Sequence, residues 1–342
     1  MTIIESDQLV APPATAPPRR RRGLPTWLTF LLKKFGYLLV VLVVVTFTVS
    51  VMLDFLPGDP ARAILGENAT QDQVDQLRQE LGLNESVFVR YADWVGNALH
   101  GDLGTSLRTG QSVSDAIVQR LPVSIELMLL VQFIALVVAI PLAIYATYRP
   151  NGWVDRLSTA WSFAAISVPH FVVGLVLIYV FALGLGWLPS SGFVPLSQGL
   201  GPNLASLALP AFALALEPAG VYQRMLRGDM RTTMHEDFVL AAQAKGMSSS
   251  NILVHQVLRP SSFSLVTLAG INTARLIGSA VVIETLFALP GVGRLLVDSI
   301  TGRDFVMIQG VVAVIAVTYV LVNVAIDLVY LVLDPRVRVS HG

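Results

Sequence analysis

The chain contains no cysteine and carries little charge for its length. Of its 342 residues, 13% are charged and 54% are hydrophobic. The lack of cysteine excludes disulfide bonds, thiolate metal sites and thiol nucleophiles. A charged fraction this low excludes an ordinary soluble domain, and a net charge of zero gives no indication of nucleic-acid binding. The composition predicts a protein that crosses a membrane several times.

Motifs of several catalytic classes are also missing. No GxxxxGK[ST] sequence occurs, so the chain does not cradle nucleotide phosphates as a P-loop does. The HExxH and GxSxG patterns are absent as well. The histidines lack the spacing of metal ligands and are His100, His170, His235, His255 and His341. We therefore expect no catalytic residue, no metal site and no cofactor in this chain.

Long apolar runs are the main feature that is present. A spanning helix needs about 20 predominantly apolar residues. Six segments meet this requirement: 35–56, 123–145, 159–183, 204–221, 265–289 and 306–333. The fourth is the weakest, because Pro210 and Pro218 interrupt it. The first has no small-residue cleavage site behind it, so we expect it to be retained as a span.

The placement of Lys and Arg predicts the orientation of these spans. Basic residues are most frequent before the first span, between the second and third, between the fourth and fifth, and after the sixth. Because such residues stay on the cytoplasmic side, both termini are predicted to be cytoplasmic. Residues 1–30 are expected to form a disordered tail, basic and Pro-rich, whose arginines lie near anionic lipid or bind a partner. Residues 334–342 form a second, short cytoplasmic tail.

The connection 57–121 is predicted to be external and helical. Thr70 and Gln73 form a capping-box pattern at the start of one helix. A second helix is expected around 87–99 and a third over 112–121. Acidic residues outnumber basic ones here, which is typical of a solvated subdomain and equally of a docking face for an external partner.

The connection 222–262 contains a polar helical hairpin between two spans. An Ala-rich helix is expected first, and a second helix follows that ends at Pro260. Such a hairpin on the basic side of a membrane protein needs a partner. The residues expected to serve it are Asp237 as N-cap, Ala241 and Ala242 on a narrow face, Gly246 as helix stop and Asn251 as the second cap.

Ionisable groups inside the fifth span are candidates for the translocation path. A charge in the bilayer is costly and is a functional candidate by default. Arg275 lies midway along this span, and Glu284 lies near its outer end, before the turn Pro290-Gly291. Either these residues line and gate a pore, or they hold the helix bundle together through hydrogen bonds between helices.

Two further patterns in the last spans concern packing. Asn323 and Asp327 lie on one face of the sixth span, where we favour a structural role. In the fifth span, small residues recur every four positions at Gly270, Ala274 and Gly278. This spacing predicts close approach of another helix, and we assign that helix to a partner subunit across a pore.

A set of short motifs occurs in the same order as in the first permease subunit of dipeptide and oligopeptide ABC importers, and the chain resembles that family. The group also includes nickel and glutathione importers. The motifs are LPGDP at 56–60, LGL at 81–83, Arg90-Tyr91 with Trp94, GDLG at 101–104, SVP at 167–169 with Phe171, WLP at 187–189, ETLF at 284–287, PGVG at 290–293 and DPRVR at 334–338. The resemblance covers almost everything from residue 35 onward. Leu240 stands where the coupling signature of such importers has an acidic residue.

This resemblance implies an all-α bundle of six transmembrane helices with a helical external insert, in a bacterial plasma membrane. It implies a second, related permease, two cytoplasmic ATPases that bind ATP and Mg²⁺, and an external solute-binding protein. The hairpin 222–262 would then couple the spans to the ATPases. Short peptides are the expected cargo, with nickel complexes, glutathione and haem as alternatives. A stand-alone channel or carrier, or a membrane scaffold, is the alternative of a different class.

Overall fold

The computed structural model describes residues 26–55, 60–65, 69–80, 84–106 and 108–333. The chain divides into two units, Met1–Tyr37 and Leu38–Gly342, and the first contains the beginning of helix α1 (Thr26–Phe55). Both predicted tails, apart from the start of α1, lie outside the described residues, as do most of the LPGDP motif and the LGL motif.

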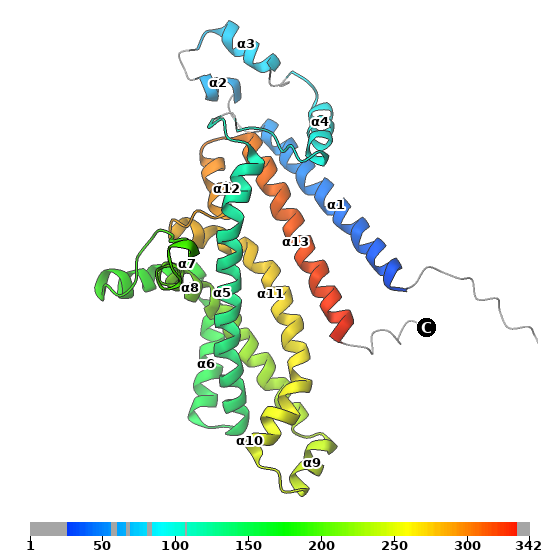
Figure 1. Ribbon diagram of the computed structural model, residues 1–342, viewed down its shortest axis with the longest axis vertical. Coiled ribbons are helices and arrows are strands. Elements are labelled where there is room, and N and C mark those ends of the chain that lie inside the picture. The colour runs from blue at the N-terminus through cyan, green and yellow to red at the C-terminus, as the bar shows by residue number, and fades with distance from the viewer. Residues whose placement is uncertain (1–25, 56–59, 66–68, 81–83, 107, 334–342) are drawn as a thin grey trace, which may run out of the picture. The chain divides into compact units, whose positions relative to one another are not determined.

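Within the described ranges every regular element is a helix, and no strand is formed. Five helices are long and apolar enough to cross a membrane. They are α1, α5 (Val113–Tyr148), α8 (Leu200–Thr233), the continuous segment Ser249–Leu286 and α13 (Phe305–Leu333) (Figure 1). Helices suit this environment because they satisfy their backbone hydrogen bonds internally. The predicted all-α membrane architecture is confirmed.

The expected third span, 159–183, is not one straight helix. The chain forms α6 (Trp153–Ser167), then α7 (His170–Leu177) with its π-helical continuation η1 (Ile178–Gly184), and the two parts are bent by 106°. Pro169 causes the break, because it lacks an N–H and keeps the preceding residue extended. The third predicted span is therefore a bent helix pair. The spans number five, or six if the bent pair is one span.

Two other helices are longer than the sequence suggested. Helix α5 joins the expected loop helix 112–121 to the second span, with Pro122 inside it. Helix α8 passes through Pro210 and Pro218 and continues to Thr233, well into the connection predicted at 222–262. Prolines are tolerated inside membrane helices when neighbouring helices pack closely around them, and Pro210 and Pro218 are both buried.

The core lies where α5, α8 and α11 (Leu258–Leu286) pack against one another. Leu127, Leu214, Tyr222 and Ile283 are fully buried there, among many alanines that allow close helix approach. A second buried cluster joins the start of α5 to α12 (Val292–Thr301) and α13.

The insert after α1 contains α2 (Pro60–Leu65), α3 (Gln71–Glu80) and α4 (Val87–Leu99). The capping box is confirmed, since the Thr70 N–H donates to Gln73 Oε1 at 3.0 Å and the Gln73 N–H donates to Thr70 Oγ1 at 3.4 Å. Phe47 of α1 packs edge-on against Tyr91 of α4, with ring centroids 5.3 Å apart. Aromatic contacts of this kind hold α4 against α1.

Candidate functional site

The hairpin between the fourth and fifth spans is built from three short pieces. Helix α9 (Asp237–Ala244) follows α8, and Gly246 then turns the chain with a φ of 76°. The left-handed conformation that the sequence indicated at Gly246 is confirmed, and only glycine adopts it without cost. Helix α10 (Ser249–Asn251) then continues through the π-helical turn η3 (Ile252–Val257) into α11.

One face of the hairpin is anchored in the core. Val239 and Ala242 of α9 are buried, as are Ile252, Leu253 and Val257 of η3. The prediction that Ala242 faces a partner was therefore wrong, because that side chain packs inward with Val239. A π-helical turn widens the helix locally, and such turns are frequent at functional sites.

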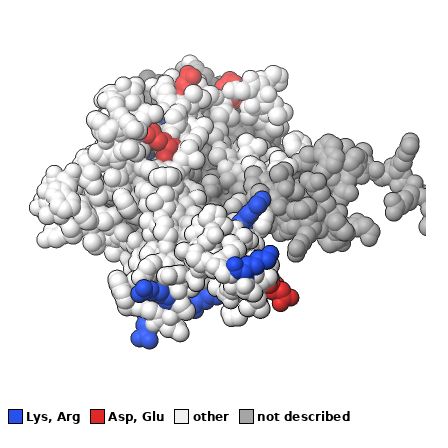
Figure 2. Space-filling view, turned by 60° about the horizontal axis from the view of Figure 1, so that its bottom comes forward, with Lys and Arg blue, Asp and Glu red and all other residues white. Residues whose placement is uncertain are grey.

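The opposite face of α9 is exposed and mostly apolar. Phe238 is 46% exposed and Leu240 is 54% exposed, and Ala241 and Ala244 are exposed beside them. Exposed apolar groups on a connection between two spans indicate a docking surface. Figure 2, in which this end of the molecule comes forward, shows Lys and Arg side chains gathered here, with most visible acidic groups elsewhere. The exposed basic residues of the nearby connections are Arg149, Arg156, Lys245 and Arg259.

Two expected caps of the hairpin are wrong. Glu236, with extended backbone, occupies the N-cap position of α9, and Asp237 is the first helical residue. Ser248 occupies the N-cap position of α10, so Asn251 lies inside the helix. The second helix does not end at Pro260 either, because it continues without a break through α11.

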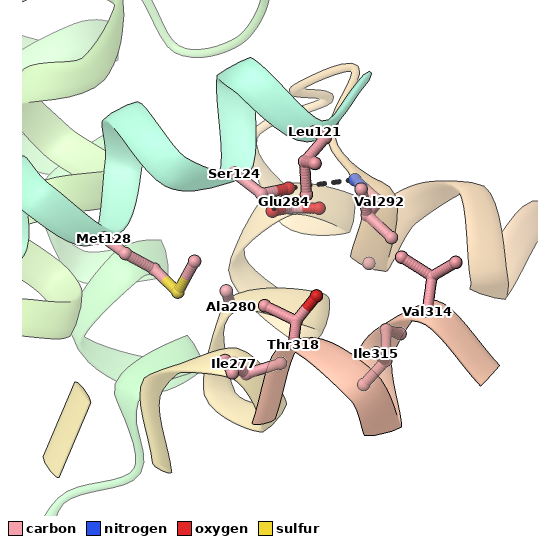
Figure 3. A pocket seen from close by; sticks show the side chains of 11 residues that line it. Leu121, Ser124, Met128, Ile277, Ala280, Glu284, Val292, Val314, Ile315 and Thr318 are labelled. Carbon is pink, nitrogen blue, oxygen red and sulfur yellow. Dashed lines mark hydrogen bonds between the residues drawn. The ribbon is translucent and has the colours of Figure 1, made fainter. Parts of the chain in front are cut away.

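Glu284 lies at a junction of three helices (Figure 3). Ser124 of α5 donates to Glu284 Oε1 at 2.6 Å, and the Arg294 N–H donates to Glu284 Oε2 at 3.1 Å. The Val292 N–H donates to Ser124 Oγ at 2.9 Å. A carboxylate here satisfies the N-terminus of α12 and complements its dipole.

The turn Pro290-Gly291 lies against this carboxylate. A Cβ on Gly291 would come within 2.3 Å of the Glu284 carboxylate, so only glycine fits. The structure thus brings together Glu284, Pro290 and Gly291, which the sequence grouped as a gate. Glu284 is 1% exposed and hydrogen-bonded through both carboxylate oxygens, which favours the second alternative, hydrogen bonding between helices.

Arg275 lies on an exposed stripe of α11. The stripe also contains Ile271, Gly278 and Val282, at helical spacing. Arg275 makes no ion pair or hydrogen bond with any described residue. The small residues of α11 have different surroundings. Gly270 packs on Ile326 of α13 in the same chain, so its assignment to a partner subunit was wrong. Among the described residues, no atom of a neighbouring helix lies within 4 Å of the Cβ position of Gly278.

Asn323 and Asp327, the two polar residues singled out in the sixth span, are not shown to join α13 to another helix. Asn323 donates from Nδ2 to the carbonyl oxygen of Tyr319 at 2.7 Å, which is a bond within α13. The side chain of Asp327 lies outside the described residues.

Three buried or half-buried polar contacts were not predicted. Asp155 of α6 accepts from Arg231 at 2.8 Å and pairs with Arg227 Nε at 2.5 Å, which joins α6 to α8. Gln132 donates to both Tyr222 and the Ala269 carbonyl, which joins α5, α8 and α11. No local sequence pattern predicts these pairings, because each one joins residues of different helices.

The third contact lies at the broken helix pair. His170 Nε2 and Glu217 Oε2 are 2.9 Å apart, with side chains 23% and 38% exposed. Glu217 belongs to the fourth apolar run, and His170 was one of the histidines without metal-ligand spacing.

Residues 139–339 match the family described as binding-protein-dependent transport system inner membrane components, and residues 27–128 match its N-terminal region. The chain belongs to this permease family. It is 37% identical to a probable peptide ABC transporter permease, y4tP, of Sinorhizobium fredii, over 90% of this chain and 99% of that protein. The permease is also 34% identical to the oligopeptide transport system permease AppB of Bacillus subtilis, over 87% and 95%.

A third relative, the glutathione transport system permease GsiC of Escherichia coli, is 32% identical over 91% of this permease and 99% of its own length. Among solved structures, a chain of the MetNI methionine ABC transporter matches with a TM-score of 0.52 and 17% identity. That match covers 64% of this permease and 95% of that chain, and it supports the fold. As an inner-membrane component, the permease is an integral membrane protein.

Proposed function

We propose that this permease forms half of the translocation pore of an ATP-driven importer of short peptides. Membership of the binding-protein-dependent family carries this proposal, and the peptide and oligopeptide systems named among its relatives support the cargo. The chain has no nucleotide-binding motif of its own, so the energy comes from partner subunits.

The partners are a second related permease, two cytoplasmic ATPases and an external solute-binding protein. The exposed face of α9 docks on an ATPase, and its buried face transmits the movement to α8 and α11. ATP binding supplies a differential free energy between two states of the pore, and the hairpin is the element that receives it. In this orientation both termini are cytoplasmic.

Within the pore, Arg275 borders the translocation cavity. Its exposed guanidinium, unpaired among the described residues, attracts the carboxylate end of a peptide. Glu284 fixes the turn Pro290-Gly291 and the start of α12, and in this way it shapes the outer end of the pore.

Uptake by the reconstituted complex tests the cargo. Proteoliposomes that contain both permeases and both ATPases, with the binding protein outside, are supplied with labelled di- to hexapeptides. We expect uptake that excess unlabelled peptide abolishes and that nickel or haem leaves unchanged. Glutathione is the second candidate, because GsiC is among the relatives. Competition by glutathione, nickel or haem alone would reassign the cargo.

A further inference from the structure

A histidine–carboxylate pair lies at the middle of the membrane-spanning helices. Glu217 is near the midpoint of α8, and His170 is the first residue of α7, directly after the break at Pro169. A broken helix and an ionisable group at mid-span are together the usual mark of a substrate contact in transport proteins. The pair plays no part in the hairpin or in the Glu284 junction.

The carboxylate of Glu217 retains capacity for another donor. His170 occupies Oε2, and Oε1 accepts no hydrogen bond from any described residue. With a side chain 38% exposed, Glu217 borders space that its own chain leaves open. Pro218 follows it and removes the usual helical donor to the carbonyl of Leu214, which adds acceptor character to this part of α8.

Glu217 and Arg275 lie on the same side of one link between their helices. Gln132 of α5 donates to the Tyr222 hydroxyl of α8 and to the Ala269 carbonyl of α11. The helices run in opposite directions from there. Glu217 is five residues away, about 7.5 Å, and Arg275 is six residues away on the same side, about 9 Å, at 1.5 Å per residue.

We propose that Glu217 binds the free α-ammonium group of a peptide in the translocation path. A carboxylate with an open oxygen, exposed at mid-span, matches the hydrogen-bond donors and positive charge of that group. His170 positions the carboxylate at the helix break. This inference rests on the proposed peptide cargo, and it adds recognition of the amino end to the proposed recognition of the carboxylate end by Arg275.

The test compares two peptides of one sequence, with a free and with an acetylated amino terminus. Uptake of each is measured in the complete reconstituted complex at saturating binding protein. For each protein, the rate for the free peptide is divided by the rate for the acetylated peptide. The wild-type ratio is then divided by the Glu217→Gln ratio, so any preference of the binding protein cancels. We expect a value of about 10, whereas Glu126→Gln, the same change in α5, should give a value near one.

A quotient near one for Glu217→Gln would overturn the inference. Co-purification with the other subunits checks assembly, and Glu217→Met replaces the Gln variant if that variant does not assemble. Glu217→Asp, which keeps the carboxylate, should retain most of the wild-type preference. If wild type takes up neither peptide, the proposed cargo fails; if it takes up peptides and the quotient is one, only the role of Glu217 fails.

Discussion

Glu284 shows how one buried carboxylate can define a helix junction. It connects α11 to α5 through Ser124 and to the first turn of α12 through the Arg294 N–H. The sequence located this residue near the outer end of a span, but its partners come from positions 160 and 10 residues away. The position of a residue within a span can be predicted from hydropathy. The residues that hydrogen-bond to it depend on how the helices pack.

We predict that Glu284→Ala lowers the free energy of unfolding by about 2 kcal/mol, because it leaves a buried N–H and a buried hydroxyl without their acceptor. The measurement is the melting midpoint of the purified complex in detergent. Thr285→Ala is the matched control, since Thr285 is exposed and bonds only within its own helix. An unchanged midpoint combined with lost transport would assign Glu284 to gating instead.

At the scale of elements, the hairpin was predictable in outline and not in detail. The glycine stop at Gly246 is a local backbone requirement, so the sequence was sufficient to find it. The sequence was not sufficient to predict the caps or the burial of Ala242, because these depend on how α9 packs against η3. The bend between α6 and α7 had a local signal in Pro169, but a continuous apolar run obscured it.

The two faces of α9 give a direct test of coupling. We expect Ala241→Glu to leave the permease inserted and folded but to reduce co-purification with the ATPases, because it places a charge on the exposed apolar face. Transport-stimulated ATP hydrolysis should fall about tenfold. Lys245→Gln, which makes the net charge more negative by the same one unit just past the end of α9, is the comparison for general electrostatics. Full stimulation in Ala241→Glu would remove this face from the contact.

At the scale of the whole molecule, the helical membrane architecture followed from composition and apolar run length. The number and length of the spans followed less well, since α5 and α8 extend beyond the apolar runs. A polar segment can extend a helix when capping and packing allow it. Hydropathy alone does not predict such an extension.

The orientation is a prediction from the distribution of basic residues, and it can be tested directly because the chain has no cysteine. Single cysteines replace Asn84, in the insert, and Ser249, in the hairpin; both positions are exposed. In intact cells, an impermeant thiol reagent should label the first variant and label the second only after permeabilisation. Labelling of the Ser249 variant alone in intact cells would invert the topology.

We propose that this permease moves its substrate by coupling to ATPases and not as a channel or carrier. The most direct measurement is uptake of a labelled tripeptide into proteoliposomes that hold the complete complex, with either ATP or an ion gradient as the energy source. We predict uptake with ATP and Mg²⁺ on the ATPase side, none with a gradient alone, and none when the ATPases are omitted. Gradient-driven uptake by the permease without ATPases would contradict the account.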